Sequence, residues 1–415
     1  MNYAYSFDLN IIHVNDIHAH FEEVSAKLGR CHQNEPCYGG TARLATKIKE
    51  LNSTTNSNHT IFLNAGDYYQ GTIWYSILKY DPVVTMANLL NYTAYALGNH
   101  DFDDGVSGLL PFLNQVNFPV LAANLNATKF PKFQEKILPS ITLNIGGTLV
   151  GVIGYITPKT SYISQPGPDI EFLDEIHSIK LECKKLKDKG VNILIALGHS
   201  GYNFDKTLAR EVPDLDVIVG GHSHSFLYTG ENPPDHSEGP YPTYITNPSG
   251  KIVPVVQAGS YSKYVGYMQL KFDDSGNLKS PVNGIGVSFA KPFLLDESIP
   301  KDEKILKAMA PYVKELEKYR KIIGFSNVFL NRSSKKECNL GDLFANAIKD
   351  YPWHDIDISF VGTGELRSVG NCIWFITFNH GKIFRLIYYQ LFFIKFMYSN
   401  NNYLSKTNEI NPINK

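Results

Sequence analysis

The chain of 415 residues is long enough for two domains, and 43% hydrophobic with 19% charged residues is typical of a folded globular protein. The net charge of −1 gives no reason to expect a nucleic-acid or anionic-membrane partner. No uninterrupted apolar run approaches the roughly 20 residues of a transmembrane helix, so none is predicted.

Strands and helices are expected to alternate over residues 9–220, which predicts an α/β layered core. The expected strands are residues 9–14, 60–63, 93–97, 118–121, 191–197 and 216–219, with a hairpin over 137–155. The expected helices are residues 40–51, 81–90, 105–116 and 173–189, the second with Asp81 as its N-cap. Further strands at 253–257 and 264–272 indicate the second sheet of a sandwich, and residues 228–250 read as a loop.

The chain is expected to divide into four segments. Residues 1–297 form the first domain. Residues 298–323 form a connector that consists almost entirely of an amphipathic helix over 299–323. Residues 324–370 begin a second α/β unit, with a helix over 339–349 and a strand over 356–361. In residues 371–415, basic residues interrupt the apolar stretches and the end is rich in asparagine, so we expect an atypical tail that is not native to the fold.

Cysteines and glycosylation sequons bear on the compartment. Cys31 and Cys37 are close enough for a local disulfide, although their spacing alone does not exclude two unpaired thiols. Residues 1–8 have neither the basic nor the apolar region of a signal peptide, so either the natural chain starts upstream or the protein is cytosolic, and we favour the first. Five Asn-x-Ser/Thr sequons favour secretion, and they begin at Asn52, Asn58, Asn91, Asn126 and Asn331.

Side chains of metal-binding type follow five of the expected strands. The densest group is Gly98-Asn99-His100-Asp101-Phe102-Asp103, in which a glycine turn leads to an amide, an imidazole and two carboxylates. Because residues i and i+2 of a strand face the same way, Asp16 with His18, and His222 with His224, are each expected to point into one cavity. The candidate ligands are Asp16, His18, Asp67, Asn99, His199, His222 and His224.

These ligands offer nitrogen and oxygen but no thiolate, a set that suits zinc, manganese or cobalt. Seven ligands exceed one tetrahedral site but suit two ions that share a carboxylate, and two ions about 3.5–4 Å apart commonly serve displacement at phosphorus. Each motif alone has a simpler interpretation, such as a turn cap or a core histidine with satisfied hydrogen bonds. Their joint occurrence, each after an expected strand, favours a two-metal site.

The five motifs resemble the five blocks of the calcineurin-like metallophosphoesterases. They are Asp16-x-His18, Gly66-Asp67, Gly98-Asn99-His100-Asp101, Gly198-His199 and Gly220-Gly221-His222-Ser223-His224. The likeness is closer still to the 5′-nucleotidase family, which includes ecto-5′-nucleotidase and salivary apyrases, and it covers about residues 9–367. It implies a four-layer α/β/β/α sandwich, a hinge helix, and a second α/β domain that binds the nucleoside and is incomplete in this chain.

The resemblance also implies a role for each site residue. One metal would be held by Asp16, His18 and His224, the other by Asn99, His199 and His222, with Asp67 bridging both. His100 would contact the phosphate and stabilise the transition state, with Asp103 orienting it. Arg367 is retained from a family block in which Gly362 and Glu365 depart from the pattern. The expected substrate contacts are Asn99, His100 and Arg367, whereas the base-stacking aromatic residues of the second domain are missing.

We therefore predict a two-metal 5′-nucleotidase that hydrolyses nucleoside monophosphates such as AMP. Zinc is the favoured metal, and manganese, cobalt, magnesium and calcium are alternatives. Two rival functions stay open: an apyrase acting on ATP and ADP, and a truncated product that binds metal with little or no turnover. An extracellular or cell-surface location is expected, and dimerisation is not, because the second domain is truncated.

Overall fold

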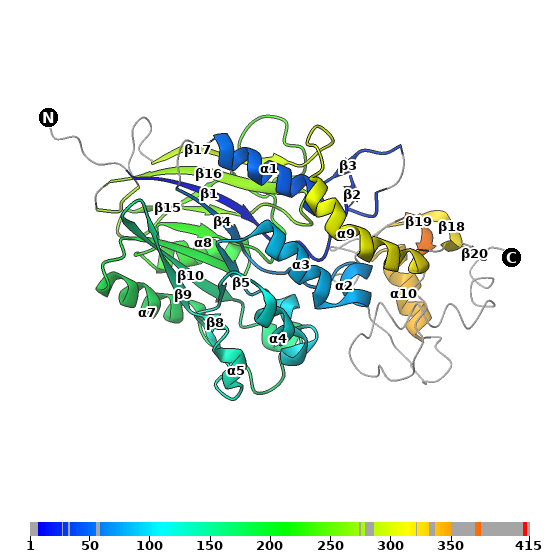
Figure 1. Cartoon of the computed structure of the whole chain (residues 1–415), viewed down its shortest axis with the longest axis horizontal. Helices are drawn as coiled ribbons and strands as arrows, with labels where there is room; N and C mark the ends of the chain where they lie inside the picture. Colours follow the sequence, from blue (N-terminus) through cyan, green and yellow to red (C-terminus); the bar gives the residue numbers. More distant parts are fainter. Residues whose placement is uncertain are drawn as a thin grey trace. The chain divides into compact units, whose positions relative to one another are not determined.

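The computed structural model describes residues 7–26, 28–31, 34–54, 59–273, 275–278, 286–320, 322–331, 337–349, 370–374 and 410–412. The chain divides into two compact units (Figure 1), the first made of Met1–Glu23 and Pro36–Met309 and the second of Val24–Glu35 and Ala310–Lys415. The first unit contains all seven candidate metal ligands.

A seven-stranded sheet forms one half of the first unit, in the order β17-β16-β1-β4-β5-β6-β8. The run from β1 to β8 is parallel, and β16 and β17 are antiparallel additions. The carboxyl ends of β1, β4 and β5 therefore meet at one edge of the sheet. Its strands are β1 (Phe7–Val14), β4 (Thr60–Asn64), β5 (Ala94–Ala96), β6 (Val120–Leu121), β8 (Ile137–Leu138), β16 (Tyr264–Phe272) and β17 (Val287–Leu294).

A six-stranded sheet forms the other half, in the order β14-β15-β13-β12-β10-β9, with the four central strands parallel. The predicted hairpin is confirmed: Ile145 pairs with Thr148 across Gly146 and Gly147, whose φ values of 58° and 91° suit a tight two-residue turn. The strands are β9 (Ser140–Ile145), β10 (Thr148–Ile156), β12 (Ile193–His199), β13 (Val217–Val219), β14 (Thr243–Thr246) and β15 (Ile252–Val256).

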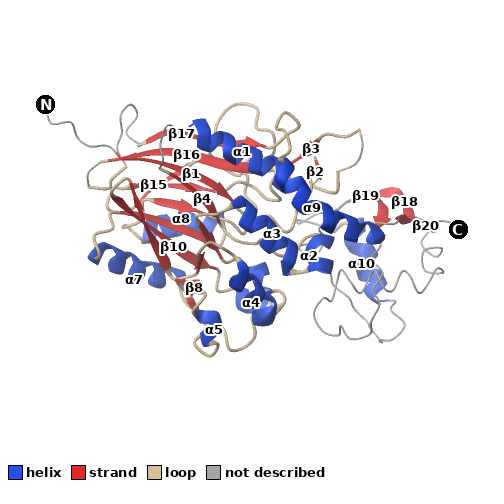
Figure 2. Ribbon diagram, in the orientation of Figure 1, coloured by secondary structure: helices blue, strands red, loops and turns tan. Residues whose placement is uncertain are grey.

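The hydrophobic core lies between the two sheets and under the helices that cover them. Leu9 and Leu63 from one sheet share a buried cluster with Val152 and Ile195 from the other. Helices α7 (Glu175–Asp188) and α8 (Tyr202–Glu211) add Ile179 and Leu208 to it, whereas α1 (Thr41–Thr54) and α3 (Tyr80–Leu90) lie on the opposite side of the strands from α7 (Figure 2). The predicted α/β/β/α sandwich is confirmed.

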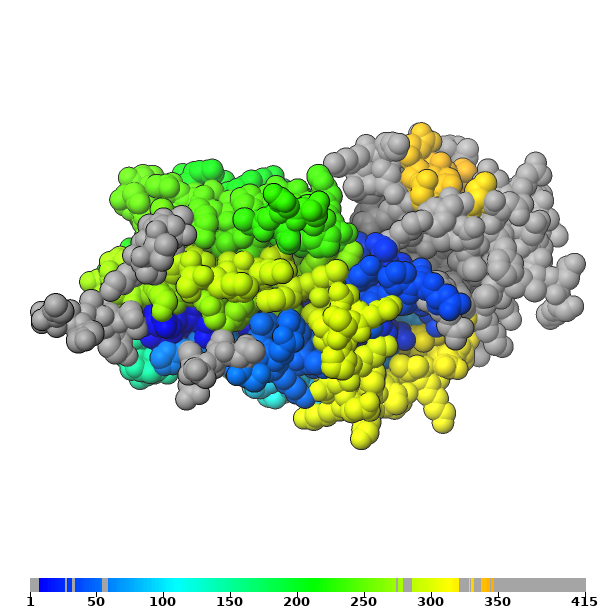
Figure 3. Space-filling model, turned by 90° about the horizontal axis from the view of Figure 1, so that it is seen from above, coloured from blue at the N-terminus to red at the C-terminus, as the bar shows by residue number. Residues whose placement is uncertain are grey.

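Residues that lead into α9 (Glu303–Leu316) pack on α1 within the first unit. Arg43 Nε donates to the carbonyl of Ile299 at 3.3 Å, Asp302 N donates to that of Ala42 at 3.1 Å, and Lys49 pairs with Asp302. In Figure 3 the yellow surface of this segment lies against the blue surface of α1. The segment that precedes α9 is therefore anchored to the first unit.

The remaining described elements are short. They are β2 (Val24–Ser25), β3 (Cys37–Tyr38), β7 (Leu125–Asn126), β11 (Glu171–Phe172), α2 (Ile73–Leu78), α4 (Gly105–Gln115), α5 (Pro131–Gln134), α6 (Thr160–Ile163), and 3₁₀ turns at Asn99–Phe102 and Glu317–Tyr319. Among the described residues, no helix combines the length and apolar character that crossing a bilayer requires.

Three predictions are corrected, and two helices are present that were not predicted. Asp81 is not the N-cap of α3, because that helix starts at Tyr80, directly after the turn at Lys79. The loop predicted over 228–250 contains β14, which pairs with β15, and α2 and α8 were not predicted. The connector helix is shorter than 299–323: Asp302 Oδ1 accepts from Ile305 N at 3.0 Å at its start, and the chain enters β18 (Ile322–Leu330) after it.

The second unit contains the predicted helix with the predicted bounds, α10 (Asn339–Lys349). Strand β18 pairs antiparallel with β19 (Gly370–Trp374) and with β20 (Ile410–Pro412). The predicted strand over 356–361 lies outside the described residues, as does Arg367.

Candidate metal centre

The candidate ligands gather where parallel strands of both sheets end. Asp16 and His18 follow β1, Asp67 follows β4, and Asn99 follows β5. His199 is the last residue of β12, and His222 and His224 follow β13. Six of them form two groups whose nitrogen and oxygen atoms lie within 4.8 Å of one another: Asp16, His18 and His224, and Asp67, His199 and His222.

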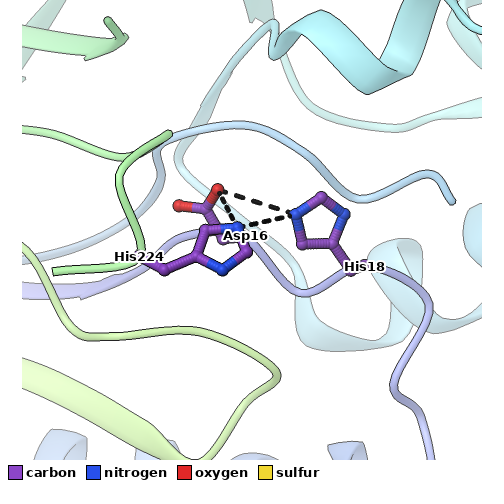
Figure 4. A group of neighbouring side chains, drawn as sticks. All are labelled: Asp16, His18 and His224. Carbon is purple, nitrogen blue, oxygen red and sulfur yellow. Dashed lines mark hydrogen bonds and ion pairs between the residues drawn. The ribbon is translucent and has the colours of Figure 1, made fainter. Parts of the chain in front are cut away.

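In the first group, three polar atoms converge (Figure 4). His224 Nε2 lies 3.0 Å from His18 Nε2 and 3.2 Å from Asp16 Oδ1, and His18 Nε2 lies 3.7 Å from the same Asp16 oxygen. Asp16 and His18 are fully buried, whereas the His224 side chain is 28% exposed. One side of this group is therefore open to solvent.

In the second group, His199 Nε2 lies 2.9 Å from Asp67 Oδ2, and the same oxygen is 3.6 Å from His18 Nε2 of the first group. Asp67 thus adjoins both groups. Asn99 is also buried here, next to His100, whose backbone N–H donates to Asp67 Oδ1 at 2.9 Å. Asn99 Oδ1 has no hydrogen-bond partner among the described residues. An unsatisfied buried acceptor costs about 1–3 kcal/mol, so this oxygen is suited to a bound cation.

Five of the seven ligands have left-handed backbone conformations instead of strand geometry. Asp16, His18, Asp67, His222 and His224 have φ values of 51°, 50°, 59°, 77° and 55°, all in the left-handed region. The side chains do converge, but the predicted reason, strand alternation, is wrong, because β1 and β13 end before these ligands begin. Such conformations cost on the order of 1–3 kcal/mol each and persist where surrounding structure enforces them.

Backbone hydrogen bonds between distant segments enforce these conformations. Asp16 N donates to the Gly66 carbonyl at 3.0 Å, and His18 N donates to the Asp67 carbonyl at 2.9 Å. At Gly98, a Cβ atom would lie 2.2 Å from Asp67 Oδ1, and at Gly221 it would lie 2.8 Å from His199 Nδ1. The glycines beside the ligands therefore leave space that the ligands themselves fill.

Backbone carbonyls orient two of the imidazoles. His199 Nδ1 lies 2.6 Å from the Ala65 carbonyl, and His18 Nδ1 lies 3.2 Å from the Tyr69 carbonyl. A carbonyl can only accept, so Nδ1 carries a proton in both rings, and Nε2 is the atom that each ring can offer to a metal ion in place of a second proton. This is the tautomer that metal-ligating histidines require.

The electrostatics of the metal-free chain also favour a cation. Burial alone would raise the pKa of Asp16 and Asp67, but the neighbouring histidines outweigh it and hold the pKa of both carboxyls well below the usual range. Burial opposes a charge on His199, yet the carboxylates of Asp67 and Asp16 raise its pKa to about 10. Burial, with His199 nearby, lowers the pKa of His222 to about 4. Two buried carboxylates thus remain ionised and require positive charge.

His100 and Asp103 form the predicted pair beside the groups. His100 Nδ1 lies 2.7 Å from Asp103 Oδ2, and the His100 side chain is 23% exposed. Asp103 also accepts from Ser164 Oγ at 2.7 Å and from Gln70 Nε2 at 3.4 Å. A bound ligand can therefore reach an imidazole whose orientation is set by a well-anchored carboxylate.

Asp101 lies on the inward side of the same turn. Its Oδ2 accepts from Tyr95 OH at 2.6 Å and from Gly98 N at 2.8 Å, and burial, with Asp67 nearby, raises its pKa to about 7. Asp101 therefore holds the turn that presents Asn99 and His100.

Sequence reasoning missed the residues that hold the ligands. Asn15 donates to Asp16 Oδ2 at 2.8 Å and to the Gly259 carbonyl at 2.6 Å. Gln70 and Ser164 support Asp103, and Gln257 contacts the loop of His222 and His224. Asn15 and Gln70 could have been noticed because each lies beside a ligand motif in the sequence. No sequence signal near Ser164 indicates its role.

The other predicted residues are placed as follows. Cys31 and Cys37 are disulfide-bonded. Three predicted glycosylation sites are exposed, and Asn126 is partly buried with its amide donating to Glu171 Oε2 at 2.8 Å. Asn58 and Arg367 lie outside the described residues. The exposed three are Asn52, Asn91 and Asn331.

Comparisons with known proteins agree with this geometry. Residues 9–226, more than half of the chain, match the calcineurin-like phosphoesterase family. The snake venom 5′-nucleotidase of Gloydius brevicauda is 42% identical over 383 residues, which cover 88% of this chain and 63% of that protein. The snake venom 5′-nucleotidase of Naja atra is 41% identical over 382 residues, covering 88% and 70%.

Among solved structures, a 5′-nucleotidase precursor from Thermus thermophilus superimposes with a TM-score of 0.76 at 34% identity, covering 83% of this chain and 66% of that one. This chain thus spans less than two thirds of the Gloydius relative. The converging ligand groups, the family match and the identity to Naja atra 5′-nucleotidase together show that the chain belongs to the 5′-nucleotidase family of calcineurin-like phosphoesterases.

Proposed function

We propose that the protein is a two-metal 5′-nucleotidase that hydrolyses nucleoside monophosphates such as AMP to the nucleoside and phosphate. The observation that carries the proposal is the position of Asp67, whose Oδ2 lies 2.9 Å from His199 in one ligand group and 3.6 Å from His18 in the other. The names of the three relatives reported above, each a 5′-nucleotidase, support the substrate class.

In this proposal Asp16, His18 and His224 hold one ion, Asn99, His199 and His222 hold the other, and Asp67 contributes to both. The unpartnered oxygen of Asn99 and the fixed tautomers of His18 and His199, all within the described part of the chain, support these roles. The nitrogen and oxygen donors favour zinc, with manganese, cobalt, magnesium and calcium as alternatives. When bound, two such ions neutralise phosphoryl oxygens and lower the pKa of water.

His100 stabilises the charge that develops on the phosphoryl oxygens. Phosphoryl transfer depends mainly on positioning and on charge stabilisation, and a protonated imidazole supplies both a charge and a directed donor. The Asp103 carboxylate accepts from His100 Nδ1, so the ring presents Nε2 to the phosphate. Asn99 and His100 thus contact the phosphate from one turn, and Arg367 is proposed as the further substrate contact.

We also propose an extracellular or cell-surface location. The Cys31–Cys37 disulfide and three exposed sequon asparagines support it, because disulfides and N-glycans are features of secreted proteins.

The test is phosphate release from AMP, ADP and ATP by the purified full chain supplied with zinc, with adenosine measured as the co-product from AMP. The proposal expects AMP to be the preferred substrate. Preferred release from ADP or ATP would favour apyrase activity, and bound metal without release from any nucleotide would reduce the protein to a binding function.

A further inference from the structure

Gln257 lies behind the loop that carries His222 and His224. It follows β15 directly and is fully buried. Its Oε1 accepts from Ser223 Oγ at 3.0 Å and from Ser225 N at 3.2 Å, and its Nε2 donates to the Gly221 carbonyl at 3.0 Å. One amide therefore contacts the residue before His222, the residue between the two histidines, and the residue after His224.

Asp205 fixes the orientation of this amide. Gln257 Nε2 donates to Asp205 Oδ2 at 2.9 Å, and Asp205 Oδ1 accepts from Tyr155 OH at 2.7 Å. Both acceptors of Nε2, a carboxyl and a carbonyl oxygen, require the amino group on that side. The amide oxygen must then face the serines, because a flipped amide would lose the bonds to the Gly221 carbonyl and to Ser225 N, whose roles as acceptor and donor are fixed.

The packing around the pair leaves the loop no room to shift toward it. A Cβ atom at Gly220 would lie 1.9 Å from Asp205 Oδ2 and 3.0 Å from Gln257 Nε2. The loop that follows Gly220 holds His222 and His224 at φ values of 77° and 55°. Such conformations cost on the order of 1–3 kcal/mol each. A fixed partner is needed to keep both residues in these conformations.

We infer that Gln257, oriented by Asp205, is a positioning residue that holds His222 and His224 in the geometry that binds metal. The inference rests on the proposed function, since the two histidines act there as ligands. One histidine belongs to each ligand group, so loss of the Gln257 amide should weaken both sites together.

The test measures zinc affinity of the full chain by competition with a chelator, for wild type and Gln257→Met. Methionine keeps the volume and removes all four hydrogen bonds. We expect zinc affinity to fall about 10- to 100-fold, the usual effect of losing a partner that orients metal ligands. The measurement is made well below the unfolding temperature of each metal-free variant.

Asn247→Leu is the matched control. Asn247 is another buried amide, and its Oδ1 accepts from Ser249 N at 3.1 Å and Lys251 N at 3.0 Å. It lies beside the start of β15, because Thr246 pairs with Ile252, whereas Gln257 follows the end of that strand. This control should lower the unfolding temperature of the metal-free chain and leave zinc affinity unchanged.

Ser223→Ala decides the question if Gln257→Met does not fold. Ser223 is exposed, so the alanine variant should fold. It loses one of the bonds to Gln257, together with the contacts of the hydroxyl to Tyr202 N at 3.0 Å and Ser225 Oγ at 2.8 Å. One neutral hydrogen bond contributes modestly to stability, so zinc affinity should fall about two- to tenfold.

Wild-type zinc affinity in Ser223→Ala, and in Gln257→Met if it folds, would overturn the positioning role and leave the proposed function intact. The same fall in zinc affinity in Asn247→Leu would also overturn it, because the effect would then follow general destabilisation. A wild-type chain that takes up no zinc would overturn the proposed function and this inference together.

Discussion

The middle and the carboxyl end of the same strands differ sharply in chemistry. Ile195, in the middle of β12, is buried among apolar side chains of both sheets. His199, at the end of that strand, is equally buried but lies 2.9 Å from a carboxylate and 2.6 Å from a backbone carbonyl. Burial of the apolar strand middles stabilises the fold. This stabilisation offsets the cost of the strained backbone and the buried charges at the strand ends.

Among changes at the strand ends, the Asp67→Asn substitution should lower activity most, because Asp67 adjoins both ligand groups. We expect AMP hydrolysis to fall by more than about 10³-fold, beyond the effect of losing one transition-state stabiliser. The fall should exceed that of His18→Ala or His224→Ala, each of which removes a ligand of one group. Steady-state kinetics of the three variants at saturating zinc check this, and an equal or smaller loss in Asp67→Asn would remove its bridging role.

His100→Ala should lower kcat by about 10²–10³-fold while both metals stay bound, because it removes one charge stabiliser from the transition state. Asp103→Asn should act in the same direction and more weakly, since His100 stays in place. Phosphate release and metal content are measured on the same preparations. An unchanged kcat in His100→Ala would exclude His100 from the reaction.

Ser164→Ala should have a smaller effect, because Ser164 acts on His100 only through Asp103. Loss of one hydrogen bond to a charged acceptor is worth about 1.5–3 kcal/mol, an upper limit here because Gln70 also supports Asp103. We expect kcat to fall several-fold with KM unchanged. Ser161→Ala is the control, since Ser161 lies in α6, which ends just before Ser164, and its Oγ donates to the Pro158 carbonyl at 2.9 Å. A kcat loss equal to that of the control would contradict the role of Ser164.

Ile195→Ala should have the smallest effect on activity and a large effect on stability. Truncating a fully buried isoleucine costs about 2–5 kcal/mol of unfolding free energy. The strand ends should keep their geometry below the unfolding transition, so kcat per folded molecule should match wild type. Denaturant unfolding measures the loss of stability, and kinetics at low temperature measure kcat per folded molecule. A large loss of kcat would show that the core around Ile195 also sets the geometry of the strand ends.

Sequence patterns predicted the regular helices and hairpins better than the backbone at the strand ends. The hairpin around Gly146 and the bounds of α10 follow local rules of turn chemistry and helical periodicity, and both are confirmed. The ligand types at the strand ends were also recognisable, because glycine, histidine and aspartate cluster there. Their backbone conformations were not, since a non-glycine residue in the left-handed region, such as Asp16, is stabilised by segments far away in sequence.

The contacts that support the ligands could not be predicted from the sequence either, because their partners come together only when the two sheets assemble. Asn15 bonds the Gly259 carbonyl across 244 residues, and His222 N reaches Asp16 across 206. Strand β14 was missed for a related reason: its place in the sheet depends on pairing with β15 and not on its own short sequence.

If two ions bind between the strand ends of the two sheets, metal analysis should find both. The purified wild-type full chain is saturated with zinc, and unbound ions are removed before the analysis. We expect two zinc ions per chain, and one ion or none would exclude the two-metal site.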